Sequence, residues 1–60
     1  MTYLVTIDQD VDSIHTDYES ARKEALTMKL NNPSWIVGVY TLFGEVKTDA
    51  SIINTKGQNI

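Results

Sequence analysis

The hydrophobic pattern of the first residues alternates with a period of two. Tyr3, Val5 and Ile7 fall on one face of residues 2–7, and Leu4 and Thr6 fall on the other. Such alternation, made largely of β-branched and aromatic residues, is typical of a β-strand. The segment therefore predicts an N-terminal strand.

A turn and a short second strand are predicted next. Residues 8–10 combine aspartate and glutamine, and aspartate is a common turn residue. Residues 11–15 then return as a strand, on which Val11 and Ser13 face away from Asp12 and Ile14.

The period changes to that of an amphipathic helix between residues 17 and 30. Residues 16–19 have the form of a capping box, in which the Thr16 hydroxyl accepts from a helix amide and Glu19 reaches back to the amide of the cap. Residues 31–33 (Asn-Asn-Pro) end the helix, because a residue before proline avoids the helical conformation. Apolar residues recur three and four apart on one stripe: Tyr18, Ala21, Ala25 and Met28.

From residue 34 the pattern alternates again, and both faces are apolar. One face holds Trp35, Val37, Val39, Thr41 and Phe43, and the other holds Ile36, Tyr40, Leu42 and Val46. A strand that is apolar on both faces is predicted to be central in a sheet. Two forms stay open: one long strand kinked at Gly44, which we favour, and a hairpin bent at residues 43–44.

The elements together predict an α+β fold. We expect an antiparallel sheet of two or three strands with one α-helix (about residues 17–30) packed on one face, in a single domain of residues 1–48. Residues 49–60 lose the periodicity and are predicted to form a flexible or partly ordered C-terminal tail, in which Ile52 and Ile53 could dock. One helix covers only one face of a sheet, so apolar side chains should stay exposed on the other.

Composition excludes several classes of protein. The 60 residues contain no cysteine, which excludes disulfide frameworks, thiolate metal sites and cysteine nucleophiles. Five basic residues against eight acidic ones give a net charge of −3, so direct binding to nucleic-acid phosphates is not expected. No apolar run is long enough to span a membrane and no secretion signal is evident, which favours a cytoplasmic location without membrane contact.

An acidic stretch follows the first strand. Asp8, Asp10 and Asp12 stand at alternate positions, and Glu19 comes eleven residues after Asp8, which resembles the ligand spacing of an EF-hand calcium loop. Ser13 stands where that loop needs glycine, and the preceding segment is a predicted strand, so calcium binding is an alternative rather than the main prediction. Residues 8–19 contain no lysine or arginine, and such a negative patch can steer a basic partner.

Catalysis is not expected. The only histidine, His15, has no group placed to orient it as a base, and one helix on a small sheet rarely encloses a reaction site. We assign no catalytic, cofactor-binding or metal-ligating residue and expect no cofactor. Aromatic side chains that stay exposed on the sheet are instead typical anchors of protein interfaces.

The layout resembles a group of phage proteins. Tyr-Glu-Ser-Ala at 18–21, Ala-Leu at 25–26, Asn-Asn-Pro at 31–33 and the following Trp/Val/Tyr strand resemble small orphan bacteriophage proteins of β(β)αβ layout. The chain is similar in layout to the phage inhibitor of bacterial RNA polymerase. This resemblance implies a compact protein that binds a host protein in the host cytoplasm and changes what that protein does.

We therefore predict a small, non-enzymatic protein-binding module, phage-encoded, that modulates or inhibits a host bacterial protein. The alternatives are an acidic-loop calcium-binding domain and a structural homodimer, joined through the uncovered sheet face or a strand edge. The residues predicted to contact a partner are acidic residues of the first turn and aromatic residues of the later strand: Asp8, Asp10, Asp12, Trp35, Tyr40 and Phe43.

Overall fold

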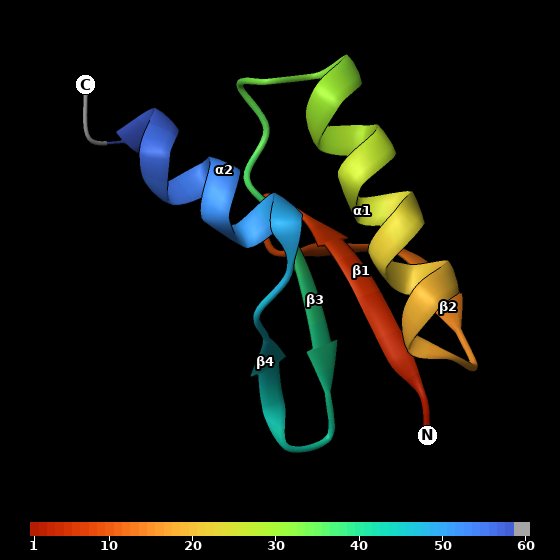
Figure 1. The fold of residues 1–60 in the computed structure, drawn as a ribbon. Coiled ribbons are helices and arrows are strands. Elements are labelled where there is room, and N and C mark those ends of the chain that lie inside the picture. Colours follow the sequence, from red (N-terminus) through yellow and green to blue (C-terminus); the bar gives the residue numbers. More distant parts are fainter. Residues whose placement is uncertain (59–60) are drawn as a thin grey trace.

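Four strands and two helices make up the fold in a computed structural model that describes residues 1–58. The sheet is antiparallel with strand order β2-β1-β3-β4 (Figure 1). The predicted α+β class is confirmed, but the sheet has four strands rather than two or three. The elements are β1 (Tyr3–Ile7), β2 (Asp10–His15), α1 (Tyr18–Asn31), β3 (Val37–Thr41), β4 (Gly44–Val46) and α2 (Asp49–Gln58).

The later strand is a hairpin, not one long strand. β3 and β4 pair from Val39–Val46 to Thr41–Gly44, and residues 42–43 form the turn. The Thr41 hydroxyl accepts from the amide of Phe43 at 3.0 Å, which closes the turn. Gly44 has a φ of 115°, a conformation that side-chain-bearing residues rarely adopt. The glycine therefore bends the chain back instead of kinking a continuous strand.

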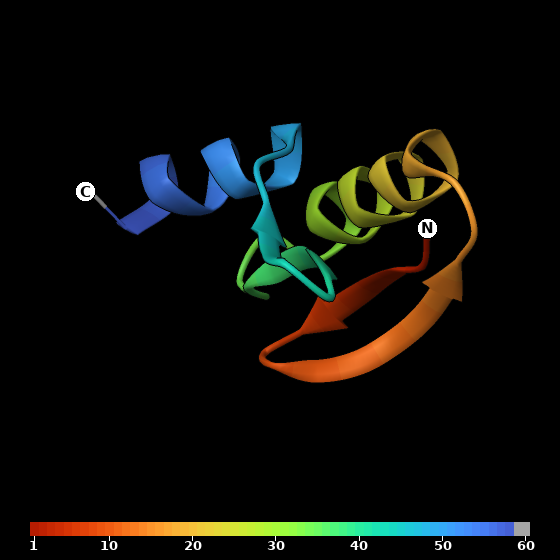
Figure 2. The same cartoon turned by 90° about the horizontal axis from the view of Figure 1, so that it is seen from below.

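Both helices pack on the same face of the sheet. Figure 2 shows them on one side, with no helix or strand of residues 1–58 on the other. The alanines on the helices are small, so the helix backbones approach the sheet closely. The resulting core is small, and its fully buried members come from both layers: Val5, Val37, Val39, Ala21, Ala25 and Ala50.

Helix α1 begins one residue later than the capping box predicts. Asp17 is the N-cap, and its carboxylate accepts from the Ser20 amide at 2.9 Å and the Ser20 hydroxyl at 3.0 Å. These hydrogen bonds, the amide first, hold the pKa of Asp17 below its ordinary value of 3.8. Glu19 does not reach back to the cap but pairs with Arg22. The predicted Thr16 cap is therefore wrong, because the aspartate accepts two hydrogen bonds at the next position.

The C-terminal end of α1 is held by a buried lysine. Lys29 is 5% exposed, and its ammonium group donates to the carbonyl of Pro33 at 2.9 Å and to the carbonyl of Trp35. Asn32 ends the helix, and its amide donates to the Met28 carbonyl at 3.0 Å. Lys29 thus ties the last turn of α1 to the loop that leads into β3.

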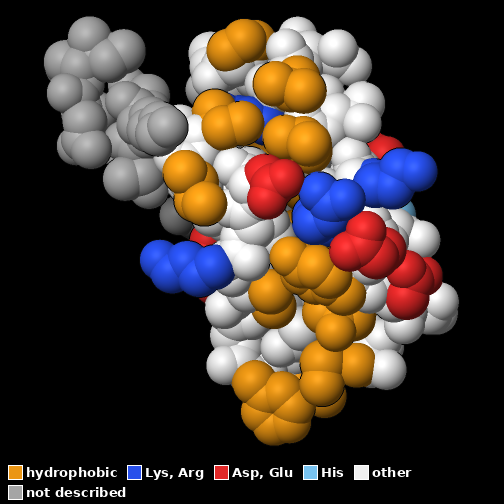
Figure 3. Space-filling view, viewed as in Figure 1, with side chains coloured by type: hydrophobic (Ala, Val, Ile, Leu, Met, Phe, Trp, Pro, Cys, Tyr) orange, Lys and Arg blue, Asp and Glu red, His pale blue; other side chains and the backbone are white. Residues whose placement is uncertain are grey.

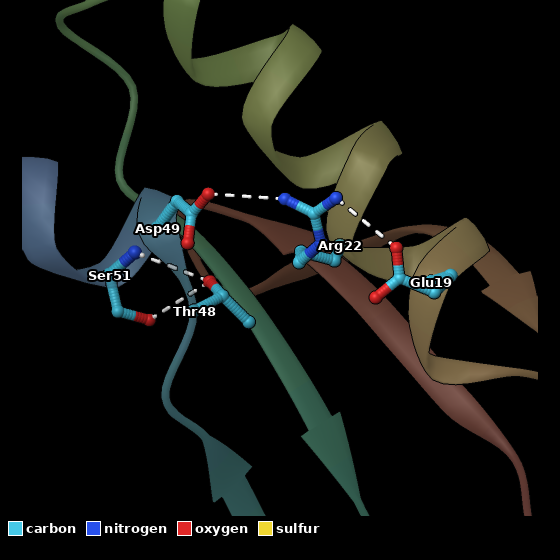
Figure 4. A network of polar contacts seen from close by, with 5 residues as sticks. All are labelled: Glu19, Arg22, Thr48, Asp49 and Ser51. Carbon is cyan, nitrogen blue, oxygen red and sulfur yellow. Dashed lines mark hydrogen bonds and ion pairs between the residues drawn. The ribbon is translucent and has the colours of Figure 1, made fainter.

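Helix α2 occupies residues for which the sequence predicts a flexible or partly ordered tail. Thr48 caps it, since its hydroxyl accepts from the Ser51 amide at 3.4 Å, and Ala50 enters the core. Arg22 of α1 lies between Glu19 at 3.2 Å and Asp49 at 3.1 Å, which links the two helices (Figure 4). Residues 59–60, the end of the predicted tail, lie outside the described residues.

A side chain of α2 also completes β3. The Asn54 amide nitrogen donates to the Val37 carbonyl at 2.7 Å, and the Val37 amide donates to the Asn54 side-chain oxygen at 3.5 Å. Strand β4 pairs only with residues 39–41, so Val37 has no backbone partner from that strand. The amide of Asn54 supplies the hydrogen bonds that a neighbouring strand would otherwise provide.

The β1–β2 turn should become more stable with residues that suit its backbone. Asp8 and Gln9 both have positive φ angles, 50° and 76°, which is the two-residue hairpin geometry that favours Asn-Gly. We expect the double variant Asp8→Asn/Gln9→Gly to raise the free energy of unfolding by about 1 kcal/mol, measured by urea denaturation. The double variant Asp8→Asn/Gln9→Val is the control. A β-branched residue strains a backbone with positive φ, so this variant should have a lower free energy of unfolding than the wild type. Equal urea midpoints for the two variants would contradict the assignment of a two-residue hairpin turn to residues 8–9.

Candidate functional site: an uncovered sheet face

The sheet face away from the helices carries a row of apolar side chains. Leu4 pairs with Ile14 on one side and with Tyr40 on the other, and directly paired residues point to the same face. Val5, the next residue of β1, is fully buried under the helices, so Leu4 must point away from them. Leu4, Val11, Ile14 and Tyr40 make up what we call the open face.

A bulge in β2 places Val11 on this face. Val5 pairs with Ser13 but Thr6 pairs with Val11, so Asp12 is an extra residue opposite no residue of β1. Thr6 is on the same face as Leu4, and Val11 therefore lies there as well. The predicted strict alternation, which put Val11 opposite Ile14, is wrong at this position.

The open face has exposed apolar residues and a shallow depression. Ile14 is 67% exposed, Val11 56% and Tyr40 37%. Between β1 and β3 lies a depression of about 260 Å³, lined by Leu4, Thr6, Gln9 and Tyr40. These are the properties of a contact surface rather than of an enclosed site.

Gly38 leaves space for the side chains that lie beside this depression. A Cβ at Gly38 would lie 3.0 Å from Cε1 of Tyr40, 3.2 Å from Oγ1 of Thr6 and 3.7 Å from Oε2 of Glu45. The Tyr40 ring and the Glu45 carboxylate therefore both reach over the space that the missing side chain leaves. Glu45 pairs directly with Tyr40 and belongs to the same face.

The β3–β4 turn adds the most exposed apolar residues of the described chain. Leu42 is 96% exposed and Phe43 86%. The space-filling view from the helix-bearing side shows hydrophobic side chains running down to this turn (Figure 3). The side chains of this turn are therefore covered neither by the helices nor by the sheet.

The aromatic residues predicted to contact a partner fall in three different places. Tyr40 lies on the open face, and Phe43 lies in the exposed turn. Trp35 precedes β3, is half-buried and packs against the core. The structure thus does not bring Trp35, Tyr40 and Phe43 together, because Trp35 packs against the core while the other two are exposed.

The three predicted aspartates also differ in their surroundings. The Asp8 carboxylate accepts from the Ile36 amide at 3.1 Å and so holds the turn against the start of β3. Asp10 and Asp12 are exposed on β2, an edge strand. Charged residues on an edge strand discourage pairing with a further strand. Among the described side chains, those of Asp10 and Asp12 form no hydrogen bond or ion pair that a partner would have to break, whereas that of Asp8 does.

The same geometry bears on calcium. Asp8, Asp10 and Asp12 lie along a β-hairpin, whereas Glu19 lies on α1 and pairs with Arg22. Among residues 1–58, no three carboxylate or imidazole groups come together in a way that could hold a metal ion. The calcium alternative therefore has no assembled site in this part of the chain.

Sequence reasoning missed the aliphatic part of the open face. Leu4, Val11 and Ile14 come from two strands, and only the pairing register with its bulge shows that they are neighbours. The sequence did indicate that such residues exist, because the predicted strands are apolar on both faces and one layer of helices covers only one of them.

Comparisons with known proteins identify no relative. No protein-family model, no curated protein and no solved structure matches the chain. Within residues 1–58, neither helix has the length and apolar character needed to cross a membrane. The function must therefore be argued from the surfaces of the protein itself.

Proposed function

We propose that this protein is a non-enzymatic protein-binding module that docks through the open face. The observation that carries the proposal is the uncovered row of Leu4, Ile14 and Tyr40, on the side of the sheet opposite both helices. Apolar groups gathered on one face of a small protein commonly mark an interface, and tyrosine is a favoured anchor there.

The resemblance in layout to small phage proteins supports a more specific role. We propose that the partner is a bacterial host protein whose activity changes when this module covers part of its surface. A shallow, open depression suits such a role, because it offers contact area without enclosing a reacting molecule.

A matched pair of variants tests the docking surface. Ile14 on the open face and Leu30 on α1 are exposed to similar extents, 67% and 63%. We expect wild-type protein and Leu30→Gln to retain the same stoichiometric partner from bacterial extract, and Ile14→Gln to retain it at least tenfold more weakly. Size-exclusion chromatography of each purified variant confirms that it is folded.

Two results would count against the proposal. If Ile14→Gln captured the partner as well as Leu30→Gln does, the open face would not be the interface. If neither the wild type nor either variant retained a stoichiometric protein, the module would lack the proposed partner.

A further inference from the structure

We infer that the open face binds a polypeptide segment in which an arginine or lysine lies beside apolar residues. The inference rests on the proposed function and specifies the chemistry of the partner. It assigns the depression beside Tyr40 to the stem of the basic side chain and Glu45 to its charged group.

Charge is distributed unequally between the two layers of the protein. The four strands and their turns contain four carboxylates, Asp8, Asp10, Asp12 and Glu45, and no lysine or arginine. All five basic residues lie on the helices or, in the case of Lys47, between β4 and α2. The sheet layer is therefore acidic and attracts cationic groups, with Glu45 on the open face, Asp8 in the β1–β2 turn and Asp10, which pairs with Ile7, on the helix-bearing face.

The carboxylates of the sheet are also not neutralised within the described part of the chain. The salt bridges there both involve Arg22, which binds Glu19 and Asp49 on the helix-bearing side. Asp10, Asp12 and Glu45 are exposed and form none. A partner cation would thus not have to displace an existing ion pair.

The local geometry at Tyr40 fits a long basic side chain. Leu4 and Tyr40 line the depression and offer an apolar wall and a ring face, which suit the methylene stem and the cation of arginine or lysine. The Glu45 carboxylate reaches over Gly38 next to the Tyr40 ring, so an acidic oxygen lies beside the depression. Arginine can form a paired hydrogen bond with such a carboxylate.

The same charges disfavour two other occupants. A second copy docked through the same face would bring two acidic layers together, and like charges in contact oppose association. A nucleic acid would bring phosphates against these carboxylates, and the strands and their turns hold no lysine or arginine to bind them. The basic, partly apolar segment is the occupant that the charges favour.

Two synthetic peptides test this inference. One is an acetylated heptapeptide of alternating leucine and arginine, and the other has glutamate in place of arginine. By isothermal titration calorimetry we expect the arginine peptide to bind at least tenfold more tightly than the glutamate peptide. In amide NMR spectra the shifted resonances should belong to β1, β3 and β4 around Leu4, Tyr40 and Glu45.

A charge-matched pair of variants separates the site from net charge. Glu45→Gln and Glu24→Gln remove the same charge, but Glu24 lies on α1. We expect Glu45→Gln to weaken the arginine peptide about fivefold, as a desolvated carboxylate–guanidinium contact allows, and Glu24→Gln to change it less than twofold. Equal effects would overturn the assignment of Glu45.

The remaining outcomes each decide the inference. Equal affinity for both peptides would overturn it while leaving an apolar docking face intact. Concentration-dependent dimers with NMR shifts on the open face would identify a second copy instead, and binding of a single-stranded oligonucleotide in place of the peptide would identify nucleic acid. Failure of the proposed function itself is seen separately, in the capture experiment with Ile14→Gln.

Discussion

Replacing Lys29 with methionine is expected to lower the free energy of unfolding by about 2 to 3 kcal/mol. The methionine keeps the apolar length of the side chain but leaves the carbonyls of Pro33 and Trp35 without their donor. Hydrogen bonds from a charged group contribute about 1.5–3 kcal/mol each, and a buried carbonyl left without a partner adds a desolvation cost. Lys29 is 5% exposed and both hydrogen bonds are part-buried, so water replaces the ammonium group only in part, at the exposed Pro33.

Urea denaturation and thermal melting measure this effect. For a domain of this size about 1 kcal/mol shifts the melting temperature by about 4–8 °C, so a fall of about 8 °C or more is expected. Lys23→Met is the matched control, because Lys23 is exposed on the same helix and should change stability by less than about 0.5 kcal/mol. Equal melting temperatures for the two variants would show that Lys29 does not hold the loop before β3.

Replacing Val39 with alanine should cost about 2 kcal/mol of stability. Val39 is fully buried on β3, and the largest fully buried side chains of the described core are three valines. Removal of two methyl groups leaves a cavity that so small a core cannot fill by repacking.

The same substitution on the other face of the sheet is the control. Val11→Ala removes the same atoms from a side chain that is 56% exposed on the open face. We expect its unfolding midpoint to stay near that of the wild type, because most of the side chain already contacts water. A loss of stability as large as that of Val39→Ala would show that the open face is part of the core.

The sequence predicted the elements that have a long, regular pattern. The stripe from Tyr18 to Met28 predicted α1, and the alternation of residues 2–7 predicted β1, because each repeats its period several times. Helix α2 gave a weaker signal, since a short cap at Thr48 is followed by polar residues and a glycine. Its first turn is stabilised by packing of Ala50 and by Arg22, neither of which local propensity reports.

The candidate site could be predicted only in part, for a related reason. The second apolar face was enough to suggest that aromatic side chains such as Tyr40 and Phe43 stay exposed, although the alternation set these two residues on opposite faces. It could not separate them from Trp35, because the side that the helices cover depends on tertiary packing. Nor could it show that the Asp8 carboxylate is already engaged by the Ile36 amide, a contact between residues 28 positions apart.

The extra residue in β2 has a consequence for how the gene could change. Deleting the codon for Asp12 would remove the residue that has no partner on β1 and leave every existing pair, from Thr6 with Val11 to Tyr3 with His15, in register. Deleting Ser13 instead would move an aspartate to the position opposite Val5, beneath the helices. Homologous genes could therefore differ in length at position 12 without any side chain of the hairpin changing sides.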